Sequence, residues 1–307
     1  MKKGYWFLEI ILIFISQTAF SQQYKTDKKL QKELQELIDS FHGTAGVYVR
    51  NLKTEKEAAI NADTIFPTAS IIKVPILIGI FNKIDSGVFT YHQPMIYRDS
   101  AAHGGSGLMQ FFKDSSQTVL NVAITLMISH SDNTAARWCE KLAGGGITIN
   151  QWLAGNGFKY TRVNARTPGR EKDNEEFGWG QTTPREMSNL MVMIREGKAV
   201  SAAASQRMYR DLTNVFWDEY ALSQMPPYVQ AASKQGMVDA SRSEAVLVNA
   251  PHGDYVFYVA TKNNADKRWK PDNEAWQLAR NVSALLWNYF EPGYGWKPAK
   301  GVEKYFY

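Results

Sequence analysis

Apolar positions recur at helical spacing in several stretches of the chain, and strand-like runs lie before and after them. Between Leu30 and Phe41 the apolar residues alternate with Lys and Glu, which predicts an amphipathic first helix beginning near Asp27. Strands are predicted at 46–49 and 57–60 and again late in the chain at 228–234, 245–249 and 254–261, with turns at 236–239 and 251–253. Helices are predicted between these two groups, among them 115–128, 133–142 and 184–195, and a last helix spans 272–289.

The residues after Ser70 form the most apolar helical stretch of the chain. Apolar side chains occupy every face of this helix up to Phe81, and such a helix is buried. Pro75 is tolerated because it lies close to the helix start. Early strands, central helices and late strands together predict an α/β domain that is split by a helical insertion. We place the α/β domain at 22–66 plus 214–290, the helical domain at 67–213, and a surface tail at 291–307.

The N-terminus has the layout of a secretory signal peptide. Lys2 and Lys3 precede an apolar run at 6–15, and the small residues Ala19 and Ser21 follow at the spacing of a cleavage site. We therefore expect a signal peptide at 1–21 and a periplasmic or secreted mature protein, with an uncleaved anchor as the alternative. No later segment is apolar enough to predict a membrane span.

Composition excludes several classes of partner and cofactor. The net charge of +5 comes without an arginine-rich run, so no nucleic-acid binding is predicted. The single cysteine, Cys139, cannot form an intramolecular disulfide and is expected to pack as a small apolar side chain. The five histidines show no zinc-ligand spacing, and we predict no metal and no cofactor. The expected partner is a small-molecule substrate, and the expected state is a monomer.

Ser70 and Lys73 form the first chemically informative pair. Ser70 opens the buried helix, where free backbone N–H groups lie, and Lys73 follows on the same face one turn later. To act as a general base, Lys73 needs its pKa lowered by about 3 units from about 10.4. Burial and a second cation, Lys234, both lower it. One Ser-x-x-Lys motif is expected by chance in a chain of this size, so the pair alone is a weak signal.

The second motif is Ser131-Asp132-Asn133. It follows an apolar stretch and precedes a predicted helix starting at Thr134, so a simple helix cap is one interpretation. In the functional interpretation Ser131 relays a proton to the leaving nitrogen, Asn133 donates its amide to a substrate carbonyl, and Asp132 holds the loop.

The third motif, Lys234-Gln235-Gly236, ends a predicted strand. The glycine allows a substrate backbone to approach the strand edge, and Lys234 supplies positive charge. The backbone N–H groups of Met237 and Ser70 are candidates for an oxyanion hole. Arg242, just past the predicted turn, is a candidate anchor for a substrate carboxylate.

In this order the three motifs resemble those of class A β-lactamases and the wider group of β-lactamase-like serine hydrolases, which are related to penicillin-binding proteins. The similarity runs from about Leu30 to Tyr289 and includes the residues at 66–69 and 180–184. The resemblance implies an α+β fold with a sheet of five antiparallel strands flanked by helices, a mostly helical lobe, and an active site in the cleft between them.

Two positions depart from the family pattern. Gln235 replaces a hydroxyl residue that would bind the substrate carboxylate. The deacylating glutamate of the family aligns with Thr167 or Asn164, and neither side chain activates water as a carboxylate does. Glu171 is the candidate substitute, and Glu175 and Glu176 lie close behind it. The alternative for these acids is solvated charge pairing with nearby Arg and Lys.

Three hypotheses follow from the sequence. The first is an exported serine hydrolase of the class A β-lactamase type, acylated at Ser70, with β-lactams as the substrate suggested by the resemblance. The second is a penicillin-binding, DD-peptidase-like protein, or another esterase or amidase, with slow deacylation. The third is a non-catalytic peptidoglycan-binding module that retains the cleft.

Overall fold

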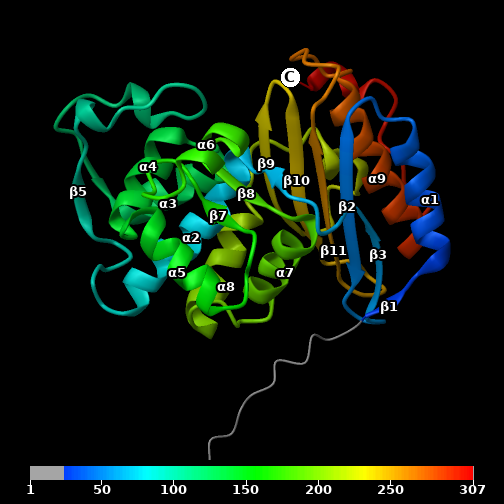
Figure 1. Ribbon diagram of the computed structural model, residues 1–307, viewed down its shortest axis with the longest axis horizontal. Coiled ribbons are helices and arrows are strands. Elements are labelled where there is room, and N and C mark those ends of the chain that lie inside the picture. The colour runs from blue at the N-terminus through cyan, green and yellow to red at the C-terminus, as the bar shows by residue number, and fades with distance from the viewer. Residues whose placement is uncertain (1–23, 307) are drawn as a thin grey trace, which may run out of the picture.

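The computed structural model describes residues 24–306 and contains one large, strongly twisted sheet packed beside a helical lobe (Figure 1). Five strands of the sheet pair with one another in the antiparallel direction. In spatial order they are β3 (Lys56–Ile60), β2 (Thr44–Asn51), β11 (Tyr255–Lys262), β10 (Ser241–Val248) and β9 (Ala231–Val238). The predicted signal peptide lies outside the described residues.

The predicted count of five strands was one too low. A sixth strand, β1 (Lys25–Thr26), pairs with β3 in the parallel direction at the edge of the sheet. Two residues are too short for the alternating pattern that identifies a strand in a sequence. The α+β class and the antiparallel arrangement of the five long strands are confirmed.

Helices cover both faces of the sheet (Figure 1). On one face lie α1 (Lys28–Asp39) and α9 (Glu274–Phe290), and on the other lies α7 (Pro184–Arg195). Alternate residues of a strand enter different cores: Val246 packs with α1 and α9, whereas its neighbours Ala245 and Leu247 pack into the core shared with the helical lobe. Helix α1 begins next to Asp27, as predicted, and Asp27 caps it by accepting a hydrogen bond from the backbone N–H of Leu30.

The helical lobe is built around α2 (Lys73–Asp85), whose residues from Lys73 to Phe81 are all buried. A 3₁₀ turn, η1 (Ala69–Ile72), leads into it. The surrounding helices are α3 (Leu120–Ser129), α4 (Asn133–Leu142), α5 (Gly145–Gly155), α6 (Glu171–Phe177) and α8 (Ala202–Leu212). Two small sheets complete the lobe: β4 (Phe66–Pro67), β8 (Gly180–Thr182) and β7 (Arg162–Val163) form one, and β5 (Pro94–Ile96) and β6 (Gln117–Val119) form the other.

Several predicted boundaries were wrong. The strand expected from 228 begins at Ala231, and the strand expected from 245 begins at Ser241. The helix expected from 115 begins at Leu120, because Gln117–Val119 are extended and pair with β5. The turn expected at 236–239 lies later, since β9 continues to Val238 and Gly236 pairs with Ser243 of β10. The later position of this turn places Gly236 and Met237 within the strand.

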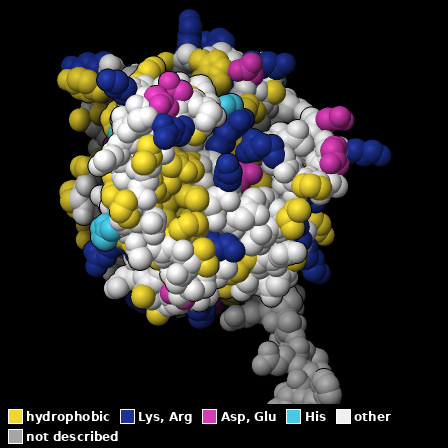
Figure 2. Space-filling model, turned by 90° about the vertical axis from the view of Figure 1, so that its left-hand side faces the viewer, with side chains coloured by type: hydrophobic (Ala, Val, Ile, Leu, Met, Phe, Trp, Pro, Cys, Tyr) yellow, Lys and Arg dark blue, Asp and Glu magenta, His cyan; other side chains and the backbone are white. Residues whose placement is uncertain are grey.

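The described residues contain no helix that is both long and apolar enough to cross a membrane. Cys139 is fully buried in the core of the helical lobe, and burial raises the pKa of its thiol to about 12, so its predicted role as an apolar packing residue is confirmed. Figure 2 shows the face of this lobe, where hydrophobic side chains gather among Lys and Arg. Large apolar side chains exposed in the lobe include Val88, Ile96, Leu108 and Phe111.

Candidate active site

The backbone before Ser70 makes an unusual turn. Ala69 has a φ of 43°, in the left-handed region that non-glycine residues rarely adopt. Hydrogen bonds hold the turn on both sides: the N–H of Thr68 donates to Gly180 O at 2.9 Å, and the N–H of Ile71 donates to Thr68 O at 2.9 Å. A strained backbone that is tightly held is typical of functional sites, and here it directly precedes the predicted nucleophile.

Lys73 lies beneath Ser70 with its amine surrounded by oxygen atoms. Its Nζ is 3.0 Å from Ser70 Oγ, 3.0 Å from Ser131 Oγ and 2.8 Å from Asn133 Oδ1. It also donates to the backbone carbonyl of Ser131. The structure thus brings Ser70, Lys73, Ser131 and Asn133 together, although 58 residues separate Lys73 from Ser131 in the sequence.

The loop that carries Ser131 is held by Asp132. Ser131 has a φ of 53°, and Asp132 caps α4 by accepting from the N–H of Ala135 at 2.8 Å. The second carboxylate oxygen of Asp132 accepts from the N–H groups of Leu108 and Met109 at 2.6 and 2.7 Å. The helix-cap interpretation of this motif is confirmed, and the same cap orients Ser131 toward Lys73.

Lys234 completes the polar chain from the sheet side. Its Nζ donates to Ser131 Oγ at 3.0 Å, to Gln235 O at 2.9 Å and to Gln235 Oε1 at 3.4 Å. A continuous path of 3.0 Å steps consequently runs from Ser70 through Lys73 and Ser131 to Lys234.

Burial strongly affects the protonation of both lysines. Lys73 is fully buried, and its pKa lies well below the usual value, first because of burial and then because of the nearby positive charge of Lys234. Burial lowers the pKa of Lys234 to about 7, although the carboxyl group of Glu244 opposes this shift. Glu244 is itself fully buried, and burial raises its pKa to about 7. Because its pKa is depressed, Lys73 can be a neutral amine under conditions where an exposed lysine is charged.

Gly236 allows β9 to approach the turn of Ser70. A Cβ atom at this position would lie 2.2 Å from Thr68 O and 2.9 Å from Ser70 N. Only glycine permits this contact, which places the backbone beside Met237 next to the backbone of Ser70.

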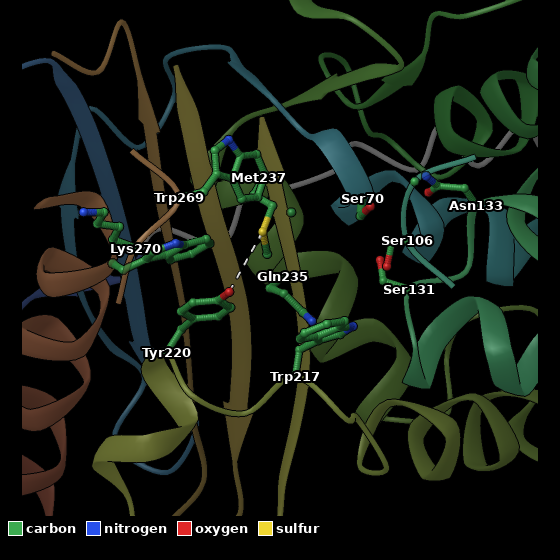
Figure 3. A pocket seen from close by; sticks show the side chains of 13 residues that line it. Ser70, Ser106, Ser131, Asn133, Trp217, Tyr220, Gln235, Met237, Trp269 and Lys270 are labelled. Atoms are coloured by element: carbon green, nitrogen blue, oxygen red, sulfur yellow. Dashed lines mark hydrogen bonds between the residues drawn. The ribbon is translucent and has the colours of Figure 1, made fainter. Parts of the chain in front are cut away.

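Ser70 lies between two hollows. The first has a volume of about 570 Å³ and is lined in part by Ser131, Asn133, Gln235 and Met237. The second has a volume of about 480 Å³ and is lined by Ser70, Asn133 and Met237 together with residues of α6 and the segment that follows it. Figure 3 shows Ser70, Ser131 and Asn133 on the helical side of the first hollow, opposite Gln235 and Met237 on the sheet side.

The comparisons with known proteins agree with this geometry. Residues 29–290 match the model of the beta-lactamase enzyme family. The chain belongs to this family.

Curated relatives and solved structures of the family differ widely from the chain in sequence. Beta-lactamase VEB-1 of Pseudomonas aeruginosa is 21% identical over 294 residues, which cover 92% of this chain and 96% of that protein. The structure of PBP-A matches with a TM-score of 0.77 and 27% identity, over 88% of this chain and 98% of that chain. A beta-lactamase from Chitinophaga pinensis matches with a TM-score of 0.76 and 18% identity, over 85% and 99% of the two chains.

The positions that align with the deacylating glutamate of the family hold buried polar side chains. Asn164 Oδ1 accepts from Arg170 Nε at 2.7 Å, and Asn164 Nδ2 donates to Gln181 Oε1 at 3.3 Å. Thr167 is buried against Gly146, where a Cβ atom would lie 1.8 Å from Thr167 Oγ1. Neither side chain is a carboxylate, and neither lines the hollows beside Ser70.

The three glutamates of α6 lie in different surroundings. Glu171 is exposed, and its carboxylate accepts from the N–H of Gly169 at 3.0 Å. Hydrogen bonds from its own backbone N–H and from that of Gly169 lower the pKa of Glu171. Glu171 lines neither hollow, whereas Glu176 lines the second hollow together with Ser70. Glu175 is exposed and lines neither of them.

Arg242 lies behind an aromatic layer. It pairs across the sheet with Met237, yet its side chain is 1% exposed and lines neither hollow. Its guanidinium lies 4.4 Å from the ring centre of Trp269 and 5.6 Å from that of Trp276. The structure therefore does not place this predicted carboxylate anchor where it can reach a substrate beside Ser70.

Sequence reasoning missed the aromatic residues of the site. Trp179 lies with its ring centre 5.7 Å from Lys73 Nζ, lines the second hollow, and donates from Nε1 to Glu140 Oε2 at 3.0 Å. The first hollow contains further aromatic side chains: Trp217, Tyr220, Trp269 and Trp276. Within residues 24–306 no group of three or more His, Cys, Asp and Glu side chains is arranged to hold a metal ion.

Proposed function

We propose that this protein is an exported acyl-transfer enzyme that β-lactams acylate at Ser70 and that releases the acyl group slowly. The continuous chain of 3.0 Å contacts from Ser70 through Lys73 and Ser131 to Lys234 carries the proposal. A group of hydrogen-bonded side chains joining a serine to a buried lysine of low pKa is the arrangement that activates a serine nucleophile.

The acylation step follows from the positions of these atoms. Neutral Lys73 takes the proton of Ser70 while Ser70 Oγ forms a bond to the carbonyl carbon of an amide or ester. The N–H groups of Ser70 and Met237 stabilise the negative charge on the carbonyl oxygen. The bond to the leaving nitrogen or oxygen then breaks, and Ser131 supplies the proton to that atom and recovers one from Lys73. Lys234 holds Ser131 in place, and Asn133 orients the substrate carbonyl.

Slow deacylation is supported by the surroundings of Lys73. In either alignment of the family's glutamate, with Thr167 or with Asn164, the chain has no carboxylate at that position, and the Trp179 indole lies beside the Lys73 amine. A general base accelerates water attack by about 10²–10⁴-fold, so the acyl-enzyme is expected to live longer by a similar factor. PBP-A, with which this chain shares its fold, has also been solved as a mutant in an acyl-enzyme complex with penicillin G.

The natural substrate consistent with a long-lived acyl-enzyme is an ester or amide other than a β-lactam, as in the esterase or amidase form of the second hypothesis from the sequence. Such a substrate can transfer its acyl group to an amine as well as to water. Location in the periplasm or outside the cell belongs to this proposal as well. A role in antibiotic resistance does not, because resistance by hydrolysis requires fast release of the acyl group.

The experiment follows a chromogenic cephalosporin and the intact mass of the mature protein together. We expect a colour burst of about one equivalent and a stable mass adduct in the wild type, and neither in Ser70→Ala. Sustained turnover would contradict slow deacylation. The absence of both burst and adduct with several β-lactams would contradict the acyl-transfer function and favour the non-catalytic binding module.

Residual hydrolysis of the adduct identifies the base. Glu176 is a better candidate than Glu171, because it lines the hollow that contains Ser70. We expect Glu176→Gln to slow the decay of the adduct while Glu171→Gln and the matched control Glu175→Gln leave the decay unchanged. If Glu171→Gln alone slowed the decay, Glu171 would be the base, as the sequence analysis suggested.

A further inference from the structure

The hollow on the Ser131 side of the nucleophile has a predominantly aromatic wall. Tyr220 and Trp276 stack with ring centres 3.7 Å apart and planes 18° apart, and Tyr220 Oη lies 4.0 Å from Met237 Sδ. Trp217 and Trp269 extend this wall around the hollow, as Figure 3 shows. Flat π surfaces at this spacing favour a flat apolar or aromatic group as occupant.

The cations near this wall are unavailable to a carboxylate. Lys234 is fully buried, and its amine already donates to Ser131 Oγ and to both oxygens of Gln235. Lys270 lines the hollow, but Figure 3 shows its amine directed away from it. Arg242 is separated from the hollow by Trp269 and Trp276.

Gln235 supplies an uncharged donor instead. Its Oε1 accepts from Lys234, while its Nε2 is buried without a hydrogen-bond partner. Figure 3 shows the side chain extending toward Trp217. An unpaired buried amide N–H is costly, and a hydrogen-bond acceptor on a bound molecule would satisfy it.

The position of Ser131 indicates whether the acyl group or the leaving group of the substrate occupies this hollow. In the proposed reaction Ser131 gives its proton to the atom that leaves the acyl carbon. Ser131 lines the aromatic hollow and not the second one. The leaving group therefore lies against the aromatic wall, and the acyl group extends toward Trp179 and Glu176 in the second hollow.

Resting on the acyl-transfer function proposed above, we infer that the enzyme selects substrates whose leaving group is an uncharged aromatic amine, alcohol or thiol. Trp269 has a second role in this selection. By stacking at 4.4 Å on the guanidinium of Arg242 it separates that cation from any carboxylate in the hollow. The buried Nε and Nη2 of Arg242 have no hydrogen-bond partner, so this arginine would bind a carboxylate if it were uncovered.

Thioesters that share one acyl group and differ in the leaving thiol test the inference. The probes are the S-benzyl, S-ethyl and S-carboxymethyl thioesters of N-acetylglycine, and released thiol is measured with a disulfide reagent. Each second-order rate constant of acylation is divided by the rate constant for hydroxide-catalysed hydrolysis of the same ester. We expect the corrected value of the S-benzyl ester to exceed that of the S-carboxymethyl ester by about 10-fold.

Substitution of Trp269 distinguishes a change in leaving-group selection from a general loss of fold stability. Trp269 is 58% exposed, so its removal is expected to leave the fold intact, which a melting curve checks. We expect Trp269→Ala to lower the S-benzyl to S-carboxymethyl ratio by roughly 10-fold and to raise the rate with the S-carboxymethyl ester. In the double variant Trp269→Ala/Arg242→Gln we expect the rate with the S-carboxymethyl ester to return to the wild-type value. Tyr228→Ala, a truncation of a 71% exposed ring outside both hollows, is the matched control and keeps the wild-type ratio.

The outcomes distinguish the inference from the function on which it rests. If neither the thioesters nor a chromogenic cephalosporin labels Ser70, the acyl-transfer function is contradicted. If the cephalosporin labels Ser70 and none of the thioesters does, the function stands and the inferred selection is overturned. If all three esters label Ser70 at equal corrected rates, or if Trp269→Ala leaves the ratio unchanged, the function stands and the inferred selection is overturned.

Discussion

Replacing Gly236 by alanine tests whether the close approach of β9 to the Ser70 turn builds the oxyanion hole. The new Cβ atom would lie 2.2 Å from Thr68 O, where ordinary contact begins at 3.4 Å, so the two backbones must separate by about 1.2 Å (3.4 minus 2.2). A hydrogen bond of about 2.9 Å that is lengthened by this amount is lost. Loss of one oxyanion donor lowers the acylation rate constant by about 10²–10³-fold.

The assay is the second-order rate constant of acylation of Gly236→Ala by a penicillin, measured by intact mass. A thermal melt shows that only folded protein is compared. Gly155→Ala is the matched control, since a Cβ atom there meets nothing within 4 Å, and it is expected to acylate at the wild-type rate. A folded Gly236→Ala protein that acylates within threefold of the wild type would refute the placement of the oxyanion hole between Ser70 and Met237.

Further predictions concern the buried charges. Because burial lowers the pKa of Lys234 to about 7, its amine loses its proton as the pH rises through 7, and the acylation rate constant is expected to fall on the alkaline side. Lys234→Arg, which stays protonated, removes this alkaline fall, and a pH profile that still falls in that variant would assign it to another group. Glu244→Gln removes a negative charge that raises the pKa of Lys234, so the alkaline fall in the acylation rate constant is expected to move to lower pH. A shift of this fall to higher pH would contradict the stabilisation of protonated Lys234 by Glu244. Asp132→Asn loses at least one charge-assisted bond to the N–H groups of Leu108, Met109 and Ala135 and should lower the free energy of unfolding by about 1.5–3 kcal/mol, which denaturant titration measures. An unchanged unfolding free energy would show that the loop is held by other contacts.

The three polar motifs were predictable because each lies on a regular element or directly beside one. Ser70 lies in the 3₁₀ turn that leads into a buried helix, Asp132 caps another helix, and Lys234 lies on a strand, so the hydrophobic pattern around each motif located it in the fold. That the three motifs lie together in the fold was predicted from their order along the chain and from the resemblance to class A β-lactamases. The five long strands were predictable for the same reason, whereas the two-residue β1 carries no pattern at all.

The aromatic wall and the position of Arg242 were not predictable from the sequence. Trp217 and Trp269 lie in irregular segments, where no periodicity shows which way a side chain points. Arg242 follows the turn at the position expected for a carboxylate anchor, but its exposure depends on a tryptophan 27 residues away in the chain. Likewise, Glu171 and Glu176 share one short helix, and only the packing of that helix decides which carboxylate lines the hollow with Ser70.

Peptide mapping of the penicillin-treated protein tests the central claim most directly. Our account predicts one penicilloyl group on the peptide that contains Ser70, still present after repeated washing, and no labelling in Ser70→Ala or in Lys73→Ala over the same time. A label on any other residue, or equally fast labelling of Lys73→Ala, would contradict it.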